Sequence, residues 1–243
     1  MSSFTFKKFT IEQDRCAMKV GTDGVLLGAW ARGGSKILDI GTGTGLISLM
    51  MAQRFPMADV SAIDIDEDAV IQARENIANS PFCELVKVEN ASLQEYAERI
   101  CSSKDLEGEN ALFDAIVSNP PYFENSLKNP DSQRTLARHT DSLSFASLVK
   151  CAYELLSDDG MFSVVLPADA IDSFMGEAYI MGFTLSRKCL VKTTPRKAPK
   201  RVLLELMKMG ASQQFESSTE CMLNPDGSRS EWYSALTREF YIR

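Results

Sequence analysis

The segment 36–52 constrains the fold of this chain more than any other. Residues 36–40 (Lys-Ile-Leu-Asp-Ile) are a short apolar run typical of a buried strand, and a glycine-threonine alternation follows at 41–45. A run typical of a helix, 46–52, comes directly afterwards. Glycine permits a tight turn and a close approach of backbone to ligand. Strand, glycine turn and helix in this order predict a doubly wound, Rossmann-like α/β fold that binds a nucleoside or a phosphate group.

An acidic residue, Asp39, stands just before this turn, whose glycines are Gly41, Gly43 and Gly45. The resulting G-x-G-x-G pattern is neither the G-x-G-x-x-G of dinucleotide sites nor the P-loop pattern. A buried acid beside the turn favours a ligand with a cationic or amino group over a pyrophosphate. A glycine motif alone is weak support for binding, so a tight turn without a ligand stays open as an alternative.

Two further strand ends carry polar residues. The segment 60–66 predicts a second strand, and its Asp64 follows the glycine turn by about 20 residues, the spacing of a carboxylate that binds the two hydroxyls of a ribose. Asp66 is interpreted as a helix cap. A third strand, 85–89, is followed by Asn90 and Ala91, where a purine would lie if Asp64 held its ribose. Asn90 could equally cap the helix predicted from residue 92.

The apolar run 112–117 predicts another buried strand, which is interrupted by Asn119-Pro120-Pro121-Tyr122. Two prolines cannot continue a central strand, because neither can donate to the ladder. An amide oxygen, a proline carbonyl and an aromatic ring are therefore expected together at a carboxyl strand end, where open α/β sheets bind ligands. Such a group suits a planar amine: two oxygens accept its N–H groups and the ring stacks on its face. A loop opened by two prolines is the alternative.

The order of these features predicts the reaction. The first strands build a site for an adenosine-like ligand with a positive head, and the later corner builds an adjacent site for a flat amine. S-adenosylmethionine, which has a ribose, an adenine and a sulfonium, meets the first requirement. We therefore expect a methyl transfer by direct displacement, in which catalysis consists mainly of positioning and of raising the electron density of the amine.

The charges of the chain are strongly segregated. The formal net charge of −7 argues against general electrostatic capture of nucleic acid. However, residues 187–208 hold eight Lys/Arg against one acid, which leaves −14 on the rest of the chain. Solvated surface lysines are the usual explanation of such a run. Because this one is stiffened by prolines, we expect phosphate contacts there, from Arg196, Lys197, Lys200 and Arg201.

Other features limit the class of protein. The six cysteines form no C-x-x-C pair and there is one histidine, so we expect neither a metal site nor disulfides, and reduced thiols in a cytoplasmic protein. No signal peptide and no membrane-spanning run is expected. We predict a single domain over 1–243, with a helix near Gly24 capped by Thr22 or Asp23 and a C-terminal tail, 210–243, packed on the domain. The predicted strands are 36–40, 60–66, 85–89, 112–117, 161–167, 182–191 and 201–209, the last two as an antiparallel pair.

The chain resembles class I S-adenosylmethionine-dependent methyltransferases with an N-P-P-Y motif, and more narrowly the bacterial tRNA1(Val) adenosine-37 N6-methyltransferases. The resemblance covers nearly the whole length and is carried by residues 19–30 (KVGTDGVLLGAW), 38–45 (LDIGTGTG), 119–122 (NPPY), 137–139 (ARH), 200–205 (KRVLLE) and 236–241 (LTREFY). The glycine turn and N-P-P-Y are shared with a broad group. The N-terminal and C-terminal segments are the more specific features.

The resemblance implies a seven-stranded, mostly parallel sheet with an antiparallel last strand in an enzyme that acts on tRNA. We expect the protein to be a monomer. It implies that segment 1–35 closes over the cofactor, which would be bound by Lys19, Thr22, Asp39, Gly41, Gly43, Gly45, Asp64, Ile65, Asn90 and Ala91. Asn119, Pro120, Pro121 and Tyr122 would surround the target adenine, and Arg138 would join the basic run on the RNA. Asn90 departs from the family, which often has aspartate near the cofactor's adenine.

Three alternatives remain at this stage. N-P-P-Y also serves N5-methylation of glutamine in release factors, which predicts an N-terminal helical domain, whereas about 35 residues precede the glycine turn here. DNA adenine methylation predicts a target-recognition domain, for which the chain has little room. A non-catalytic adenosine-nucleotide sensor would need the cofactor cradle but neither Asn119 nor Tyr122.

Overall fold

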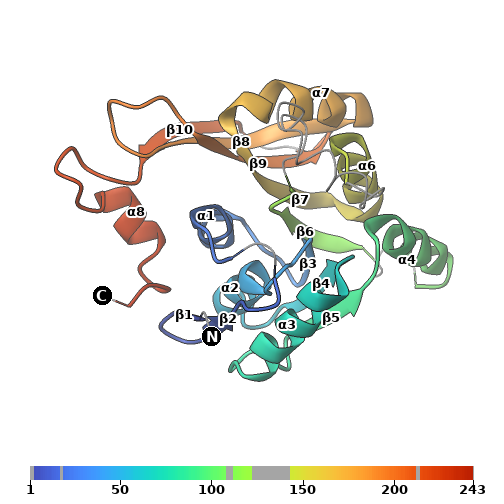
Figure 1. Cartoon of the computed structure of the whole chain (residues 1–243). Helices are drawn as coiled ribbons and strands as arrows, with labels where there is room; N and C mark the ends of the chain where they lie inside the picture. Colours follow the sequence, from blue (N-terminus) through green and yellow to red (C-terminus); the bar gives the residue numbers. More distant parts are fainter. Residues whose placement is uncertain (1–2, 17–18, 108–111, 122–142, 212–213, 243) are drawn as a thin grey trace, which may run out of the picture.

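The fold is described by a computed structural model covering residues 3–16, 19–107, 112–121, 143–211 and 214–242 (Figure 1). Within these residues the elements follow in the order β1 (Ser3–Thr5), β2 (Thr10–Glu12), α1 (Thr22–Trp30), β3 (Lys36–Ile40), α2 (Leu46–Arg54), β4 (Asp59–Asp64), α3 (Glu67–Ala78), β5 (Val86–Asn90), α4 (Leu93–Glu107), β6 (Phe113–Ser118), α6 (Phe145–Leu155), β7 (Leu156–Pro167), the 3-10 turn η3 (Ala168–Ala170), α7 (Ile171–Met181), β8 (Phe183–Lys192), β9 (Arg201–Lys208), β10 (Glu216–Cys221) and α8 (Glu231–Leu236). None of the described helices is both long and apolar enough to span a bilayer.

One large sheet organises the molecule, with strand order β10-β8-β9-β7-β6-β3-β4-β5. Strand β9 is antiparallel to its neighbours β7 and β8, whereas the other neighbouring pairs are parallel. The predicted Rossmann-like sheet with an antiparallel last strand is therefore confirmed. The structure adds β10, which pairs with β8 at the edge. Its sequence, Glu-Ser-Ser-Thr-Glu-Cys, lacks the apolar alternation that predicts a strand. Such a polar sequence is tolerated here because a strand at the edge of a sheet can remain exposed.

Helices cover both faces of the sheet: α1, α2 and α3 lie on one side and α4, α6 and α7 on the other (Figure 1). Each face buries its own hydrophobic cluster. Neighbouring residues of β3 alternate between them, since Ile37 packs with the first cluster and Leu38 with the second. The near-continuous apolar sequence of the central strands follows from this burial on both faces.

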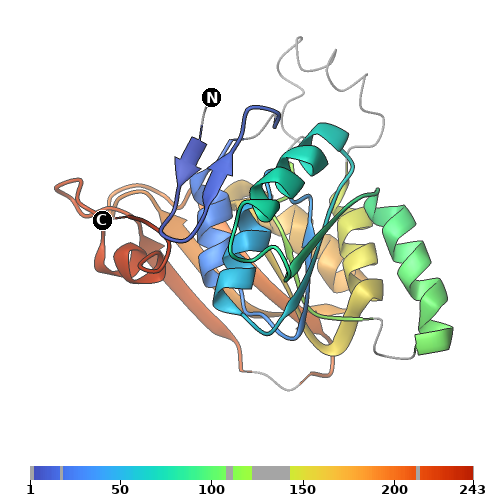
Figure 2. The same cartoon turned by 90° about the horizontal axis from the view of Figure 1, so that it is seen from below.

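The two ends of the chain meet on the face covered by α1 and α2. Lys7 N donates to Phe240 O at 2.8 Å, and the rings of Phe6 and Tyr241 stack with centroids 5.9 Å apart. Phe6 and Phe240 are both buried in the first hydrophobic cluster. The β1–β2 hairpin consequently lies beside the C-terminal segment (Figure 2).

Helix α1 is held at its C-terminal end by two arginines from other elements. Arg54 of α2 donates to the carbonyls of Gly28 and Ala31 at 3.0 and 2.6 Å, and Arg187 of β8 donates to Trp30 O at 2.8 Å. Cations at these carbonyls satisfy the last acceptors of the helix and complement its dipole. The helix is thus fixed against α2 and the sheet.

Candidate active site at the carboxyl edge of the sheet

The glycine turn and the Asn-Pro-Pro corner lie at the same edge of the sheet, on adjacent strands. Strand β3 pairs in parallel with β6, and the last residues of the two strands, Ile40 and Ser118, are register partners. The hydroxyl of Ser118 donates to Ile40 O at 2.9 Å, which ties the two strand ends together. Gly41 and Asn119 directly follow these residues. The two predicted half-sites are therefore neighbours at the crevice where α/β sheets bind ligands.

The turn after β3 is formed by three glycines with left-handed backbone. Gly41, Gly43 and Gly45 all have positive φ angles, of 72, 55 and 81°. A Cβ at Gly41 or Gly43 would meet no heavy atom of the described residues within 4 Å, so these two glycines border open space in that part of the chain. A Cβ at Gly45 would instead lie 3.4 Å from the Cβ of Ala73 in α3. The first two glycines thus leave room for a ligand, and the third allows close helix packing.

Asp39 is fully buried beneath the turn with one oxygen bonded and the other without a partner. Its Oδ2 accepts from Thr42 Oγ1 at 2.8 Å, from Ser48 Oγ at 2.6 Å and from Ser48 N at 3.1 Å. Its Oδ1 is buried without a hydrogen-bond partner among the described residues. Burial raises the pKa of Asp39 from 3.8 to about 6, against the lowering effect of the Ser48 and Thr42 hydrogen bonds. An unpartnered buried acceptor beside an open cradle is suited to a cationic or N–H-bearing ligand.

Asp64, at the end of β4, links the turn to the next strand. Its Oδ2 accepts from Gly43 N at 2.8 Å and its Oδ1 from Asp66 N at 3.0 Å. Burial raises the pKa of Asp64, while the backbone donors lower it. Ile65 follows with an exposed fraction of 55%, unusual for a large apolar side chain beside a polar crevice. As predicted, Asp66 caps α3, by accepting from Asp68 N at 3.0 Å.

Asn90 and Ala91 bind the backbone at the end of β4. Asn90 Nδ2 donates to the carbonyls of Asp64 and Ile65 at 3.0 and 3.1 Å, and Ala91 N donates to Asp64 O at 3.1 Å. The alternative that Asn90 caps the following helix is wrong. Ser92 does so, since its Oγ accepts from Glu95 N at 3.2 Å while the Glu95 carboxylate accepts from Ser92.

At the corner after β6, Asn119 is half-buried and Pro120 is buried, with Pro121 following half-buried. The chain leaves the strand at Asn119, as two successive prolines require. Tyr122 and Arg138 lie outside the described residues. The structure thus describes the amide and the first proline carbonyl of the predicted target site.

The N-terminal part of the site differs from expectation at its helix cap. Helix α1 begins at Thr22 with Gly21 as N-cap and has no side-chain cap hydrogen bond, so the predicted capping by Thr22 or Asp23 is wrong. Asp23 instead pairs with Arg201 on β9. Lys19 is exposed just before the helix. From Gly24 to Ala29 the helix is buried, so this part of α1 belongs to the core of the fold.

The basic run forms the connection between β8 and β9. Arg196, Lys197 and Lys200 are exposed, whereas only 19% of the Arg201 side chain is exposed because it faces Asp23. The connection ends beside the carboxyl end of β7, since Arg201 is the register partner of Pro167. Its cations therefore lie at the same sheet edge as the glycine turn and Asn119.

Sequence patterns did not indicate three side chains that shape the site. Thr42 and Ser48 hold Asp39, and Asp23 holds Arg201. Hydroxyl residues in a turn and in a first helical turn are common for local reasons, so their inward direction is visible only in the fold. Within the described residues, no group of three His, Cys, Asp or Glu is placed to hold a metal ion.

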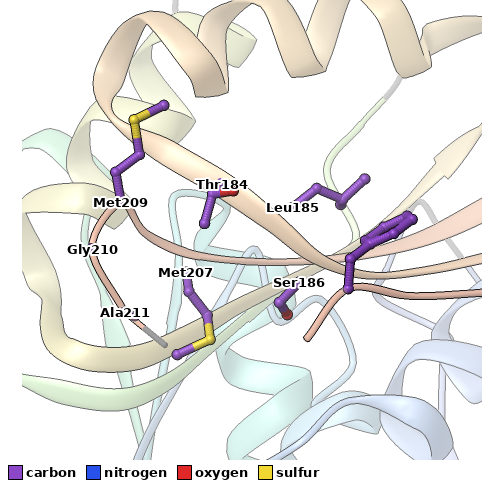
Figure 3. Close-up of a pocket in the computed structure, with 8 residues that line it drawn as sticks. Thr184, Leu185, Ser186, Met207, Met209, Gly210 and Ala211 are labelled. Atoms are coloured by element: carbon purple, nitrogen blue, oxygen red, sulfur yellow. The ribbon is translucent and has the colours of Figure 1, made fainter. Parts of the chain in front are cut away.

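A separate pocket of about 280 Å³ lies at the opposite end of β8 and β9 (Figure 3). It is lined by Thr184, Leu185, Ser186, Met207, Met209, Gly210, Ala211 and Phe215. These residues are at the start of β8, the end of β9 and the segment before β10. The pocket is therefore remote from the edge that carries the acidic and amide groups.

Comparison with known proteins agrees with this geometry. Residues 21–171 match the family model of the methyltransferase small domain. A protein of Phocaeicola vulgatus named tRNA1(Val) (adenine(37)-N6)-methyltransferase is 49% identical over 98% of this chain and 97% of its own length. Proteins of the same name from Trichodesmium erythraeum and Escherichia coli O157:H7 are 50% and 41% identical, covering 98% and 95% of those proteins. The chain belongs to the tRNA1(Val) (adenine(37)-N6)-methyltransferase family.

The structure of this chain also superposes on solved structures of other methyltransferases. A predicted O-methyltransferase of Agrobacterium tumefaciens superposes with a TM-score of 0.66 at 16% identity, covering 90% of this chain and 96% of that one. The glycopeptide N-methyltransferase MtfA, in complex with S-adenosylmethionine, gives a TM-score of 0.53 at 14% identity, covering 78% of this chain and all of that one. At these identities the likeness shows a shared class I methyltransferase fold.

Proposed function

We propose that this chain transfers a methyl group from S-adenosylmethionine to the exocyclic N6 of an adenosine in tRNA, adenosine 37 of tRNA1(Val). The supporting observation is the pairing of β3 with β6, which brings the glycine turn and Asn119 to adjacent positions on one edge. Methyl transfer by direct displacement requires donor and acceptor sites this close together. The names of the relatives that match the whole chain support the choice of substrate.

The residues of the crevice fit S-adenosylmethionine. In this proposal Asp39 receives the charged methionine portion against its unpartnered Oδ1, and the open surfaces of Gly41 and Gly43 lie along it. Asp64 binds the ribose, with Ile65, Asn90 and Ala91 around the adenine. Lys19 and Thr22 border the cofactor from the N-terminal side. When bound, S-adenosylmethionine supplies an electrophilic methyl group on a sulfonium.

The acceptor site activates the amine by hydrogen bonding. The Asn119 side-chain oxygen and the Pro120 carbonyl accept its two N–H groups, which localises the nitrogen lone pair and aims it toward the cofactor cradle. Pro121 fixes the corner and Tyr122 stacks on the base. Arg138, Arg196, Lys197 and Lys200 contact the RNA backbone. We further propose that residues 1–243 act as one domain and as a monomer, in the cytoplasm where tRNA is found.

Incubation with a labelled methyl donor and total bacterial tRNA tests this function directly, followed by mapping of the modified nucleoside. We expect N6-methyladenosine at one position of one tRNA. Asn119→Ala should retain affinity for S-adenosylhomocysteine and lose methyl transfer by about 100-fold or more, because it removes one acceptor at the reacting amine. A matched incubation with a release factor covers the glutamine-methylating alternative. Label in that factor and none in tRNA would overturn the proposal.

A further inference from the structure

The ion pair between Asp23 and Arg201 joins the two halves of the proposed active site. Asp23 is in the first turn of α1, directly after Thr22, one of the residues proposed to border the cofactor. Arg201 is the first residue of β9, directly after Lys200 in the basic connection. The pair is formed by Arg201 Nε and Asp23 Oδ1. It therefore links an element at the cofactor side to the element that carries the phosphate-binding cations.

The Asp23 end of this link is fixed. A Cβ at the next residue, Gly24, would lie 3.1 Å from Leu46, the residue that follows the glycine turn. The other end of α1 is held by Arg54 and Arg187, as described above. Because both ends of the helix are restrained, the position of the Asp23 carboxylate is set by the same elements that form the cofactor cradle.

At the Arg201 end, the basic connection is closed by backbone hydrogen bonds of Lys200. Lys200 N donates to Val191 O and Lys200 O accepts from Ala168 N, both at 3.1 Å. These bonds close the connection at β8 and at the end of β7, whereas the side chains of Arg196 and Lys197 point out to solvent with no ion pair among the described residues. Arg201, which directly follows Lys200, is the residue whose side chain joins this end of the connection to α1.

The partial burial of the Asp23–Arg201 pair indicates that the pair positions Arg201 rather than adding net stability to the fold. The side chains are exposed by 19% for Arg201 and 33% for Asp23, so both charges are partly desolvated. Such a pair contributes little net stability, because desolvation offsets most of the attraction, but it holds the Arg201 guanidinium against the Asp23 carboxylate. Arg201 Nη1 also lies 3.9 Å from Met222 Sδ, so the guanidinium is directed into the fold. Arg201 therefore differs from Arg196, Lys197 and Lys200, whose side chains are exposed.

We propose that Asp23 and Arg201 are positioning residues that hold the basic β8–β9 connection at the distance from the cofactor cradle at which a bound RNA presents its base to Asn119. This inference rests on the proposed function. It assigns to Asp23, an acidic residue, a favourable effect on the binding of a polyanion. Simple electrostatics predicts the opposite sign, which makes the inference testable.

The test compares Asp23→Asn, Arg201→Gln and the double variant, with tRNA affinity measured directly and with kcat and KM. We expect each single change to raise the Kd and the KM for tRNA about tenfold, and the double change to cost no more than one single change. Affinity for S-adenosylhomocysteine and kcat should stay within about twofold. Asp158→Asn is the matched control, because it breaks the ion pair of Lys208 at the other end of β9 and should leave tRNA binding unchanged.

Two outcomes would overturn the inference. Tighter tRNA binding by Asp23→Asn would mean that Arg201 contacts phosphate directly once its partner is neutral. A parallel fall in melting temperature, S-adenosylhomocysteine affinity and tRNA affinity would mean that the pair only supports the fold. Asp23→Asn is nearly isosteric, so the test remains available if Arg201→Gln does not fold. Failure of the proposed function is distinct, since it shows as no methyl transfer to tRNA by the unaltered chain.

Discussion

At the scale of single residues, the site depends on acids that are kept away from water. Asp39 has no exposed surface and has a pKa of about 6, chiefly because burial disfavours its charge. The carboxyl is therefore protonated more readily in the folded chain than in the unfolded one. Between pH 3.8 and about 6 the folded state binds the extra proton, so this residue's contribution to stability falls as the pH rises.

The same residue predicts how cofactor binding depends on pH. A cationic or amino-bearing ligand needs the ionised carboxylate, so affinity for S-adenosylhomocysteine should fall by up to about tenfold per pH unit below pH 6. Calorimetric titration between pH 5 and 8 measures this dependence, with the free ligand's own ionisation subtracted. Asp39→Asn should bind weakly and without that slope. An unaltered slope in the variant would assign the titration to another group.

At the scale of elements, the effect of backbone strain in the turn between β3 and α2 can be measured separately from the effect of ligand contact. Gly43 and Gly227 both have positive φ, 55 and 86°, and at neither position would a Cβ lie within 4 Å of another atom of the residues that the structure describes. Alanine at either position should cost about 1–2 kcal/mol of stability, because left-handed backbone is strained for a residue with a Cβ. Only Gly43→Ala places a methyl group in the proposed cradle.

We therefore expect both variants to lower the melting temperature by similar amounts, and only Gly43→Ala to lose affinity for S-adenosylhomocysteine, by about 100-fold. Thermal unfolding and ligand titration of the pair provide the measurement. Equal affinity in both variants would show that the open surface at Gly43 faces no ligand.

The central sheet also contains a buried carboxylate, Glu205 on β9, which is fully inaccessible. It pairs with Arg187 of the neighbouring strand at 3.1 Å and with Arg32 at 3.3 Å. Removing it leaves the partly buried Arg187 without its counter-ion. Glu205→Ala should lower the free energy of unfolding by about 3–5 kcal/mol.

Glu89→Ala is the control for that change, since Glu89 pairs with Arg99 at 2.6 Å but about half of each side chain is exposed. Its cost should stay below about 1 kcal/mol because water screens exposed pairs. Urea unfolding of the two variants distinguishes the cases. Similar losses of unfolding free energy in the two variants would mean that other groups offset the removal of the buried Glu205 carboxylate.

At the scale of the whole molecule, an acidic protein carries a cluster of cations at the sheet edge of the proposed active site. The net charge of −7 repels RNA in general, so local placement of cations must direct binding. Neutralising Arg196, Lys197 and Lys200 together should weaken tRNA binding and reduce the slope of log K against log salt by about 2–3. Neutralising the exposed Lys8, Lys87 and Lys150 changes net charge equally and should leave the slope nearly unaltered. Equal effects from both triple changes would refute a localised RNA surface.

Much of the fold follows from local patterns. Buried strands are apolar on both faces, and glycines mark the turn that leaves room at a strand end, so β3, its turn and α2 could be predicted within a residue or two. The segment β10 could not, because its exposed polar sequence acquires strand geometry only by pairing with β8. Asn90 illustrates the same limit within the site: its side chain could cap a helix or bind a neighbouring strand, and only the position of β4 decides.

The sequence by itself determined the class of chemistry, since the order of Asp39, the glycine turn, Asp64 and the Asn-Pro-Pro corner is fixed along the chain. The tertiary structure decided which charges face one another. In the sequence, Arg201 is one more cation in a basic run. In the fold, its side chain pairs with Asp23, 178 residues earlier in the chain. Partners so distant in sequence leave no local pattern, because their contact is created by the packing of α1 across β7 and β9.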